Sequence, residues 1–438
     1  MQPSTSKKIL ILGAGIAGIS AAYHAKLQGN HNILILEKSM RAGGLLNNFE
    51  VEGFRFDQAI HLSFTKDEYV RSVFDEVPHY AHYPDVYCYE TPHWLKHPVQ
   101  NNLFQLSIEE KVSLIKSFFS RPDSQPQNFY EWLVHQYGEE IANRYPVPYT
   151  KKYWATEPEN LGLDWILGRM RRASADEILH GSMTSKTGNG YYAQEMRYPK
   201  EGGYRAFIEP LLKDLNIHLG KHVVAVDVSK RIVKCADGSE YGYDYLVNTF
   251  PLPLFVEMLK DVPAHIREAA KTLWATQVDL LSVGISKPDA VPHLWFYLYD
   301  EKFLPARAYS VGHKSSSNVP AGCSAIQFEI YSSPRRPLAI NVESLNQHVL
   351  EILDKLGIAK QEEIIFVDHR SLPYGNVVFD YGMENRRNIV REYVNEINVI
   401  LAGRFGEWEY YWSDQAFLSG KRAAKTIIEN TDKNNIGY

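Results

Sequence analysis

The first forty residues contain a pattern that restricts the fold more than any other part of the chain. An apolar run at residues 7–12 is followed by the glycine-rich turn Gly13-Ala14-Gly15-Ile16-Ala17-Gly18 and by a helical pattern at residues 19–27. A second apolar run at residues 32–36 then ends in the acid Glu37. This is the pattern of a βαβ unit that binds a dinucleotide, with the acid at the expected distance from the glycines. We therefore predict a Rossmann-type α/β domain at the start of the chain.

Each glycine of the turn has its own physical role. Gly13 permits a tight turn, Gly15 lets the backbone approach a pyrophosphate at the helix N-terminus, and Gly18 lets the helix pack against the strand. The carboxylate of Glu37 can accept hydrogen bonds from an adenosine ribose. The predicted dinucleotide-binding residues of this segment are Gly13, Gly15, Ala17, Gly18, Glu37 and Lys38.

The next turn indicates which dinucleotide is bound. In Arg41-Ala42-Gly43-Gly44-Leu45, two adjacent glycines suit a second backbone approach to the pyrophosphate, and Arg41 supplies positive charge. FAD enzymes of the amine-oxidase superfamily usually carry such a turn, and the segments 202–204 and 248–251 also resemble flavin-domain elements of that superfamily. A last strand near residues 397–401 would deliver Gly403 to the flavin. We predict FAD as the cofactor.

Composition limits the class of protein and its partners. The 438 residues are 45% hydrophobic and 23% charged, which suits a globular protein of two or three domains with large cores. A net charge of −5 without a basic tract argues against nucleic acid as a partner. Three widely spaced cysteines suggest neither a disulfide framework nor a metal site, so we expect a cytoplasmic protein. The polar first residues do not resemble a signal peptide, and no apolar run is long enough to span a membrane.

Hydrophobic periodicity predicts a discontinuous domain organisation. Residues 1–66, 191–251 and 385–438 are assigned to the FAD-binding domain, 67–190 to a mainly helical substrate domain, and 252–384 to an antiparallel sheet over the flavin. The coarse assignments are helices at 108–119, 129–143 and 415–430, a hairpin formed by 219–228 and 231–235, and buried strands at 245–248, 280–285 and 324–330.

Several separate motifs then resemble one family, the UDP-galactopyranose mutases, and in particular their eukaryotic-type branch. The segment Phe56-Asp57-Gln58-Ala59-Ile60-His61 resembles that family's loop at the flavin ring, and His61 matches its histidine. The family usually has Gly-Gly where this chain has Ala59-Ile60, which leaves open whether the loop moves with the redox state of the flavin. A buried histidine of purely structural role is the alternative for His61.

The segment 97–103 resembles the family's nucleotide-binding stretch. Gln100 matches a residue that contacts the uracil, while His97 replaces a tyrosine and Val99 replaces an aromatic residue. Uracil is therefore the default base, with guanine or thymine, or a modified sugar, left open. A helix-capping turn without a ligand is the alternative for this segment.

Two arginines lie at family-like distances from tryptophans. Arg169 follows Trp154 by fifteen residues, and Arg307 follows Trp295 by twelve. The resemblance implies that Trp154 and Trp295 line the sugar site and that both arginines clamp a diphosphate, for which planar guanidinium donors are well suited. Arg169 has two arginine neighbours and could instead be solvated.

The C-terminal motif from Gly403 to Tyr410 also resembles the family. It implies Gly403, Arg404 and Gln415 at the flavin and Tyr410 at the diphosphate, with Tyr374 as a weaker match to a substrate tyrosine. The resemblance also implies Val224 as a cofactor contact. No metal site is predicted.

The resemblance implies an isomerase without net redox change. In that family the N5 atom of reduced flavin attacks the anomeric carbon, a flavin–sugar adduct forms, and the pyranose and furanose forms of a nucleotide-diphosphate sugar interconvert. NAD(P)H is a possible reductant, although the chain shows no second dinucleotide pattern. The alternatives are an FAD-dependent oxidoreductase of the amine-oxidase or protoporphyrinogen-oxidase type, and a flavin-binding protein without turnover. The oligomeric state cannot be read from the sequence.

Overall fold

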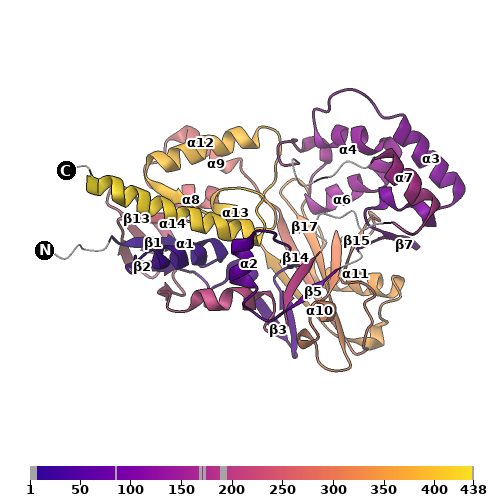
Figure 1. Ribbon diagram of the computed structural model, residues 1–438, viewed down its shortest axis with the longest axis horizontal. Helices are drawn as coiled ribbons and strands as arrows, with labels where there is room; N and C mark the ends of the chain where they lie inside the picture. The colour runs from indigo at the N-terminus through magenta and orange to yellow at the C-terminus, as the bar shows by residue number, and fades with distance from the viewer. Residues whose placement is uncertain (1–6, 84–85, 167–169, 171–173, 188–194, 437–438) are drawn as a thin grey trace.

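The computed structural model describes residues 7–83, 86–166, 170, 174–187 and 195–436, with side chains to residue 430. A parallel sheet of five strands lies near both chain ends in the order β19-β13-β1-β2-β9 (Figure 1). The strands are β1 (Ile9–Leu12), β2 (Ile33–Leu36), β9 (Ile217–His218), β13 (Tyr245–Asn248) and β19 (Val399–Leu401). The residues of β1 and β2 are all buried, as expected for a parallel sheet covered on both faces.

Two long helices pack side by side beside this sheet, α1 (Ile16–Leu27) and α14 (Ser413–Ile436) (Figure 1). Their backbones approach so closely that a Cβ atom on Gly420 would lie 2.3 Å from the carbonyl oxygen of Ala17. Both predicted helices, at 19–27 and 415–430, are thereby confirmed. The start of the chain and its last helix form one layer because small residues line their contact.

Three more helices and a small sheet complete this half of the molecule. The helices are α8 (Leu252–Met258), α9 (Ala264–Lys271) and α12 (Met383–Glu396). The sheet has the strands β10 (Val223–Asp227), β11 (Ile232–Cys235) and β12 (Glu240–Gly242), paired antiparallel. The first two form the predicted hairpin.

The second large sheet has seven strands in the order β18-β14-β17-β16-β15-β6-β7. Their bounds are Ile364–Leu372, Gln277–Ile285, Ser324–Ser332, Arg307–Ser310, Trp295–Leu298, Tyr87–Glu90 and His93–Lys96. The expectation of a purely antiparallel sheet is wrong at one pair, because β15 runs parallel to β6. The helix α11 (Val342–Lys355) contacts this sheet at β18, and the short helix α10 (Val311–Lys314) contacts it at β17.

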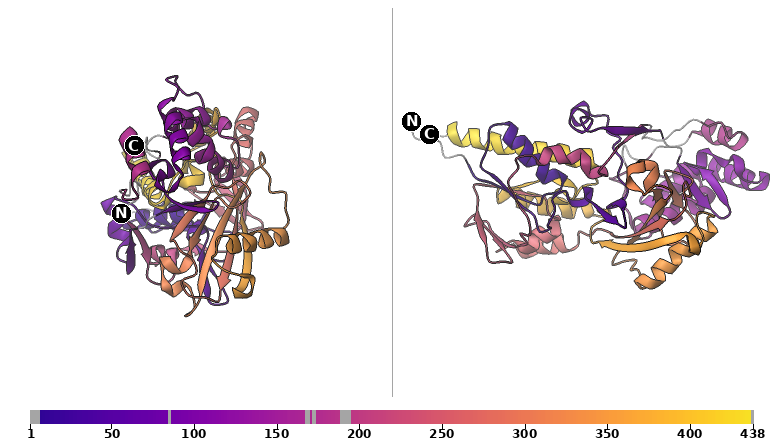
Figure 2. Two further views of the ribbon diagram at one scale, coloured as in Figure 1. Left: turned by 90° about the vertical axis from the view of Figure 1, so that its right-hand side faces the viewer. Right: turned by 90° about the horizontal axis from the view of Figure 1, so that it is seen from below.

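The helical part of the molecule lies at the end opposite the two termini (Figure 2). It contains α3 (Ile108–Phe119), α4 (Phe129–Tyr137), α5 (Glu139–Arg144), α6 (Pro146–Tyr153) and α7 (Ala175–Met183). The helix predicted at 129–143 is divided at Gly138, which has a φ of +82° and whose Cβ would lie 2.4 Å from the carbonyl oxygen of Ser117. Close contact with α3 therefore ends α4 where periodicity alone continues.

Smaller elements connect the two halves. Two of them are two-stranded ribbons, β3 (Asn48–Val51) with β4 (Phe54–Asp57) and β5 (His79–His82) with β8 (Met196–Pro199). Two are helices, α2 (Glu68–Phe74) and the one-turn helix α13 (Gly403–Gly406) near the C-terminus. Short 3-10 turns lie at 44–46, 99–101, 103–105, 158–160, 204–212, 316–318 and 361–363.

The strands of the parallel sheet come from the three segments 1–66, 191–251 and 385–438, whereas β6 and β7 of segment 67–190 join the sheet of segment 252–384. The division into domains remains a prediction. None of the helices in the described part of the chain combines the length and the apolar character needed to cross a bilayer. Nor do the described residues contain a cluster of three or more His, Cys, Asp or Glu side chains suited to a metal ion.

Candidate active site

The glycine turn after β1 forms an open cradle at the N-terminus of α1. Gly13 has a φ of +98°, and a Cβ on Gly18 would lie 2.0 Å from the carbonyl oxygen of Gly13, so only glycine fits at position 18. A Cβ on Gly15, by contrast, would meet no atom within 4 Å. The first amides of a helix have no intrahelical acceptor and attract anions. The turn therefore offers free space and backbone donors at the same place.

Glu37 stands at the end of β2, beside this turn. Its carboxylate accepts hydrogen bonds from the amides of Ala14 (2.9 Å) and Ser39 (2.8 Å), and its side chain is buried. Lys38 is exposed. The geometry holds the acid next to the glycine turn, where a ribose could reach it.

The second glycine pair lies against the first. The amide of Gly43 donates to the carbonyl of Ala14 at 2.7 Å, and Gly15 and Gly43 form an isolated parallel bridge. A Cβ on Gly44 would be 3.0 Å from the Cα atom of Gly15. The buried Arg205 holds this turn, since its guanidinium donates to the carbonyl of Ala42 and to the side chain of Asn47.

Arg41 is the exposed arginine of the same turn. Its Nη1 atom donates to the backbone carbonyl of Asn48 at 3.1 Å, and Leu45 beside it is half-buried. The prediction singled out Arg41 and missed Arg205, because nothing in the sequence near residue 205 indicates contact with residues 42–47. A buried arginine here supports the turn from behind.

The C-terminal part of the cradle comes from the segment after β19. A Cβ on Gly403 would lie 2.7 Å from the Cβ atom of Ala17, and the Gly403 amide donates to Ser419 Oγ at 2.8 Å. The last strand therefore brings Gly403 to the start of α1, as the sequence indicated. Val224 lies in β10 and is 46% exposed.

Two buried donors close to Tyr153 and Tyr410 have no hydrogen-bond partner among the described residues. They are Nε of Arg404 and Nδ2 of Asn376, and the Nη2 atom of Arg404 donates to Oδ1 of Asn376 at 2.6 Å. Buried donors of this kind are costly unless a ligand satisfies them. Together with the open space at Gly15, they fit a dinucleotide whose polar ring end reaches Arg404.

The loop that ends in His61 is held by charged residues from distant segments. The amide of Ile60 donates to Oε1 of Glu329 at 2.8 Å, and Asp57 forms a fully buried ion pair of 2.5 Å with Lys314. Ala59 has a φ of +74°, an unfavourable value for a residue with a Cβ atom. The loop is thus fixed at both ends although it contains no glycine.

His61 itself is half-buried beside Tyr204, with ring centroids 5.2 Å apart. Its Nδ1 atom lies 3.1 Å from the carbonyl oxygen of Ala59. Burial lowers its pKa to about 4, although Asp57 acts in the opposite direction. The imidazole is therefore neutral at neutral pH.

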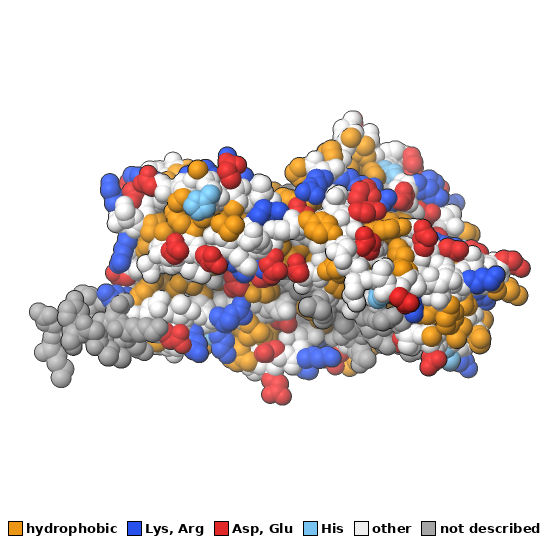
Figure 3. All heavy atoms as spheres, turned by 90° about the horizontal axis from the view of Figure 1, so that it is seen from above, with side chains coloured by type: hydrophobic (Ala, Val, Ile, Leu, Met, Phe, Trp, Pro, Cys, Tyr) orange, Lys and Arg blue, Asp and Glu red, His pale blue; other side chains and the backbone are white. Residues whose placement is uncertain are grey.

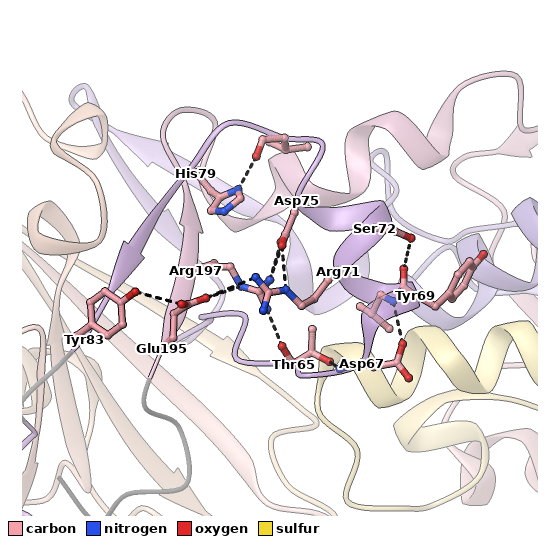
Figure 4. Close-up of polar contacts among 12 residues, drawn as sticks. Thr65, Asp67, Tyr69, Arg71, Ser72, Asp75, His79, Tyr83, Glu195 and Arg197 are labelled. Atoms are coloured by element: carbon pink, nitrogen blue, oxygen red, sulfur yellow. Dashed lines mark hydrogen bonds and ion pairs between the residues drawn. The ribbon is translucent and has the colours of Figure 1, made fainter. Parts of the chain in front are cut away.

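The segment after His61 is anchored by Arg197 of β8, which is 2% exposed (Figure 4). The Nη1 atom of Arg197 donates to both carboxylate oxygens of Asp75 at 2.7 and 2.6 Å, and Nη2 donates to the carbonyl of Thr65 at 2.7 Å. Two backbone hydrogen bonds between Ser63 and Arg197 complete the attachment. This contact fixes the position of the loop relative to the ribbon β5–β8.

Arg307 begins β16 and lies opposite Glu329 of β17. Its Nε atom donates to Glu329, its Nη2 atom donates to the hydroxyl of Tyr331 at 3.1 Å, and Tyr331 donates to Glu329 at 2.6 Å. Burial alone would lower the pKa of Arg307, but the carboxylate of Glu329 overrides this and raises it well above the ordinary value. The guanidinium is permanently charged and held in one orientation.

A pair of tyrosines connects Arg307 to the C-terminal motif. The hydroxyls of Tyr153 and Tyr410 are 3.0 Å apart. The guanidinium carbon of Arg307 lies 5.4 Å from the Tyr153 ring centre, and that of Arg404 lies 5.0 Å from the Tyr410 ring centre. Trp154 packs against Tyr410 with centroids 5.3 Å apart. The structure thus brings Trp154, Arg307, Arg404 and Tyr410 together, although they come from four different segments.

The segment 97–103, predicted to bind the nucleotide, lies next to the second sheet. His97 packs against Tyr297 with ring centroids 4.8 Å apart, and Tyr297 is the cross-strand neighbour of Arg307. The Sγ atom of Cys88 lies 3.4 Å from Nδ1 of His97, and burial lowers the pKa of His97 to about 4. Gln100 is half-buried in the short turn 99–101, and Trp295 is buried at the start of β15.

The predictions for Arg169, Tyr374 and Gln415 have three different outcomes. Arg169 lies outside the described residues. Tyr374 packs against Phe405 with centroids 5.6 Å apart, whereas Asn376, two residues later, contacts both Arg404 and Tyr153. Gln415 accepts a hydrogen bond from the amide of Trp412 at 3.0 Å. It lines a polar cavity of about 230 Å³ together with Tyr410.

The sequence analysis missed Glu329, Tyr331, Tyr153 and Asn376. One signal was present in the sequence Ser-Ala-Ile-Gln-Phe-Glu-Ile-Tyr-Ser of β17, where a glutamate lies within a strand that is buried along its whole length. A charged residue in such a strand must be paired. Its partner could not be found without the register of the sheet.

Curated relatives match only a short part of the chain. An L-amino-acid oxidase of Demansia vestigiata is 45% identical over 51 residues, which are 12% of this chain and 10% of the relative. A 4,4'-diapophytoene desaturase (4,4'-diaponeurosporene-forming) of Staphylococcus haemolyticus is 35% identical over 68 residues, 16% of this chain and 13% of the relative. The matched segment therefore spans about a tenth of the length of these relatives.

Solved structures match over nearly the whole chain. A reduced UDP-galactopyranose mutase superposes with a TM-score of 0.91 at 22% identity and covers 97% of this chain and 96% of its own. A putative protoporphyrinogen oxidase from Exiguobacterium sp. 255-15 gives a TM-score of 0.76 at 19% identity, with 97% and 99% covered. These likenesses confirm the predicted fold class, an α/β protein with a Rossmann-type FAD-binding domain and a second, mainly antiparallel sheet, which the structure shows to contain one parallel pair.

The family model for flavin-containing amine oxidoreductases matches residues 16–428, which is most of the chain. The family implies FAD as the cofactor, in agreement with the glycine cradle and the buried donors described above. The chain belongs to the flavin-containing amine oxidoreductase family.

Proposed function

We propose that the protein is an FAD-dependent nucleotide-sugar mutase that interconverts the pyranose and furanose forms of a nucleotide-diphosphate hexose, with UDP-galactose as the default substrate. One observation carries the proposal. Two guanidinium groups, of Arg307 and Arg404, lie over the rings of Tyr153 and Tyr410, whose hydroxyls are 3.0 Å apart. The motif resemblance and the fold likeness to a UDP-galactopyranose mutase support it.

The Arg307 end of this arrangement suits a diphosphate, and the Arg404 end suits the flavin. Planar guanidinium donors and tyrosine hydroxyls can meet phosphate oxygens, and a buried aromatic surrounding strengthens such contacts. We assign Arg307, Arg169 and Tyr410 to the diphosphate, Trp154 and Trp295 to the sugar, and His97 and Gln100 to the base. Arg404 and His61 would face the flavin. Tyr374 is a weaker candidate than Asn376 for a substrate contact.

The hydrogen bonds of the Glu329 carboxylate limit the chemistry that this side chain can perform. Its carboxylate is fully buried and accepts hydrogen bonds from Arg307, Tyr331 and Ile60, so it is not free to act as a general acid or base. Bound FAD in its reduced form would supply the nucleophile. The side chains would then orient the anomeric carbon and stabilise the departing diphosphate through Arg307 and Tyr410.

An FAD-dependent oxidoreductase is the second candidate. The short sequence matches to an L-amino-acid oxidase and to a desaturase favour it, since the names of those relatives describe redox enzymes. A carotenoid-like apolar substrate would leave the arginine and tyrosine cluster without a partner. An amino-acid carboxylate, however, could also bind an arginine. A flavin-bound protein without turnover is the third possibility and predicts binding without product.

The deciding experiment compares the two redox states of the purified holoprotein. The protein is reduced with dithionite and incubated with UDP-, GDP- and dTDP-hexoses, and chromatography follows the furanose product. We expect product from one of them in the reduced state only. Anaerobic bleaching of the oxidised flavin by L-amino acids, with no furanose formed from any nucleotide sugar, would overturn the proposal.

Two variants test whether the activity depends on Tyr410 and Arg307. Tyr410→Phe removes a hydroxyl at the site, while Tyr381→Phe, on an exposed tyrosine, is the control. Arg307→Lys keeps the charge but not the planar donors, and Arg370→Lys on β18 of the same sheet is its control. We expect the Arg307 variant to lose about 2–4 kcal/mol of transition-state stabilisation in kcat/KM. Wild-type turnover by the folded Arg307→Lys protein would contradict the assignment of Arg307.

A further inference from the structure

The α3 helix carries apolar side chains that are largely exposed to solvent. Ile108, Val112 and Phe119 are 71%, 47% and 58% exposed, and Phe104, one turn before the helix, is 44% exposed. The helix lies in the helical part, far from the two termini (Figure 1). In the view from above, that right-hand end shows hydrophobic side chains between charged ones (Figure 3). Exposed apolar groups that follow one helix face mark an interaction site more often than isolated ones.

The spacing of these residues is that of a helix seam. Ile108, Val112, the half-buried Ile115 and Phe119 follow one another at intervals of four, three and four residues. Such intervals place side chains along one stripe of a helix. The residues that attach α3 to its own core, Leu114 and Phe118, are buried and lie on a different face. Ile115 packs partly against the core of its own chain, whereas Ile108, Val112 and Phe119 of the stripe remain largely exposed.

We propose that the stripe is the contact surface for a second copy of this chain, with the two α3 helices packed antiparallel about a twofold axis. In that arrangement Ile108 faces the partner's Phe119, and Val112 faces the partner's Ile115. The same contacts recur on the other side of the axis, which passes between Ser113 and Leu114. A surface that is complementary to itself is what a twofold dimer requires.

Charge supports the same partner. Beside the stripe, Glu109 and Lys116 are both exposed, and antiparallel packing sets Glu109 next to the partner's Lys116 at two symmetric places. A membrane surface suits this face less well, because Glu110, Glu139 and Glu140 lie near α3 and would repel anionic lipid. One helix pair is a small interface, so we expect a dimer of micromolar affinity.

The first experiment measures the molecular mass of the FAD-loaded full chain by light scattering over a range of micromolar concentrations. We expect the mass to rise from 50.2 kDa toward twice that value. Val112→Glu should weaken the dimer at least roughly tenfold. Val342→Glu is the control, since Val342 lies on α11 and is 45% exposed, close to the 47% of Val112. A wild-type protein that stays at the monomer mass throughout would overturn the proposal.

The second experiment tests the antiparallel pairing itself. Glu109→Lys alone sets two lysines against each other, and Lys116→Glu alone sets two glutamates against each other, so each variant should be monomeric. An equimolar mixture of the two restores both attractive pairs and should dimerise. A mixture that remains monomeric while the wild type dimerises would overturn the register. Co-sedimentation of the wild type with anionic vesicles, without a dimer, would assign the stripe to a membrane and overturn the proposal.

Discussion

Arg307 and Glu329 face each other on the neighbouring strands β16 and β17, and the guanidinium donates to a carboxylate that is fully buried. Glu329 also accepts the amide of Ile60 at 2.8 Å. One carboxylate therefore holds both the proposed diphosphate arginine and the loop that ends in His61. Ile60 in that loop and Glu329 are 269 positions apart in the sequence.

Removal of one partner of this buried pair should be costly. Glu329→Leu alone would leave Arg307 without its counter-charge and should lower the free energy of unfolding by about 3–5 kcal/mol. The double change Arg307→Met with Glu329→Leu should recover much of that loss, because no buried charge remains. Urea unfolding of the four proteins in a double-mutant cycle measures the coupling. Additive effects of the two single changes would show that the pair is not energetically linked.

Acid should destabilise the protein through His97. Burial lowers its folded pKa to about 4, whereas an unfolded histidine titrates near pH 6.5. The unfolded chain therefore binds the proton first, so the stability present above pH 6.5 is lost as the pH falls from about 6.5 to about 4. The full effect of this one group is about 3 kcal/mol. His97→Phe should flatten the dependence of unfolding free energy on pH in this window, and an unchanged slope would argue against the burial effect.

Ala59 should be replaceable by glycine with a gain in stability. Its φ of +74° is unfavourable for alanine by about 1–2 kcal/mol, while glycine adopts it freely and loses somewhat more chain entropy on folding. We expect Ala59→Gly to raise the free energy of unfolding by up to about 1 kcal/mol. Ala269→Gly in the interior of α9 is the control and should lower it by about 1 kcal/mol. Equal losses in both variants would mean that the loop carries no strain.

Alanine at Gly15 and alanine at Gly18 should impair the protein in different ways, the first in FAD binding and the second in folding. Gly15→Ala meets open space in the protein, so it should fold like the wild type but bind less FAD. Gly18→Ala places a Cβ atom 2.0 Å from the backbone oxygen of Gly13 and should impair folding itself. The flavin absorbance per protein and the melting temperature of the apoprotein separate the two outcomes. A fully FAD-loaded Gly15→Ala protein would show that the cofactor does not approach this residue.

Local patterns predicted most of the flavin-binding half correctly. The strands β1 and β2 follow from continuous apolar runs, and the helix α1 and the hairpin β10–β11 follow from local helical and hairpin patterns, all of which depend only on neighbouring residues. The helix predicted at 129–143 was wrong at Gly138, because the contact that divides it comes from α3. The antiparallel sheet was wrong at the pair β15–β6, since β6 belongs to a distant segment.

The candidate site shows the same limit. Arg404, Tyr410 and Trp154 were found by motif, but Asn376 and Tyr153, which join them, carry no signal of their own. Short-range sequence therefore determined the glycine cradle, the acid at the end of β2 and the cofactor class. Only the tertiary structure decided which charges meet, as in Arg307 with Glu329 and Asp57 with Lys314, which are 257 positions apart. The physical reason is that long-range packing sets which side chains share a buried space, through the register of β16 and β17 in the first pair and through the contact of α10 with β4 in the second.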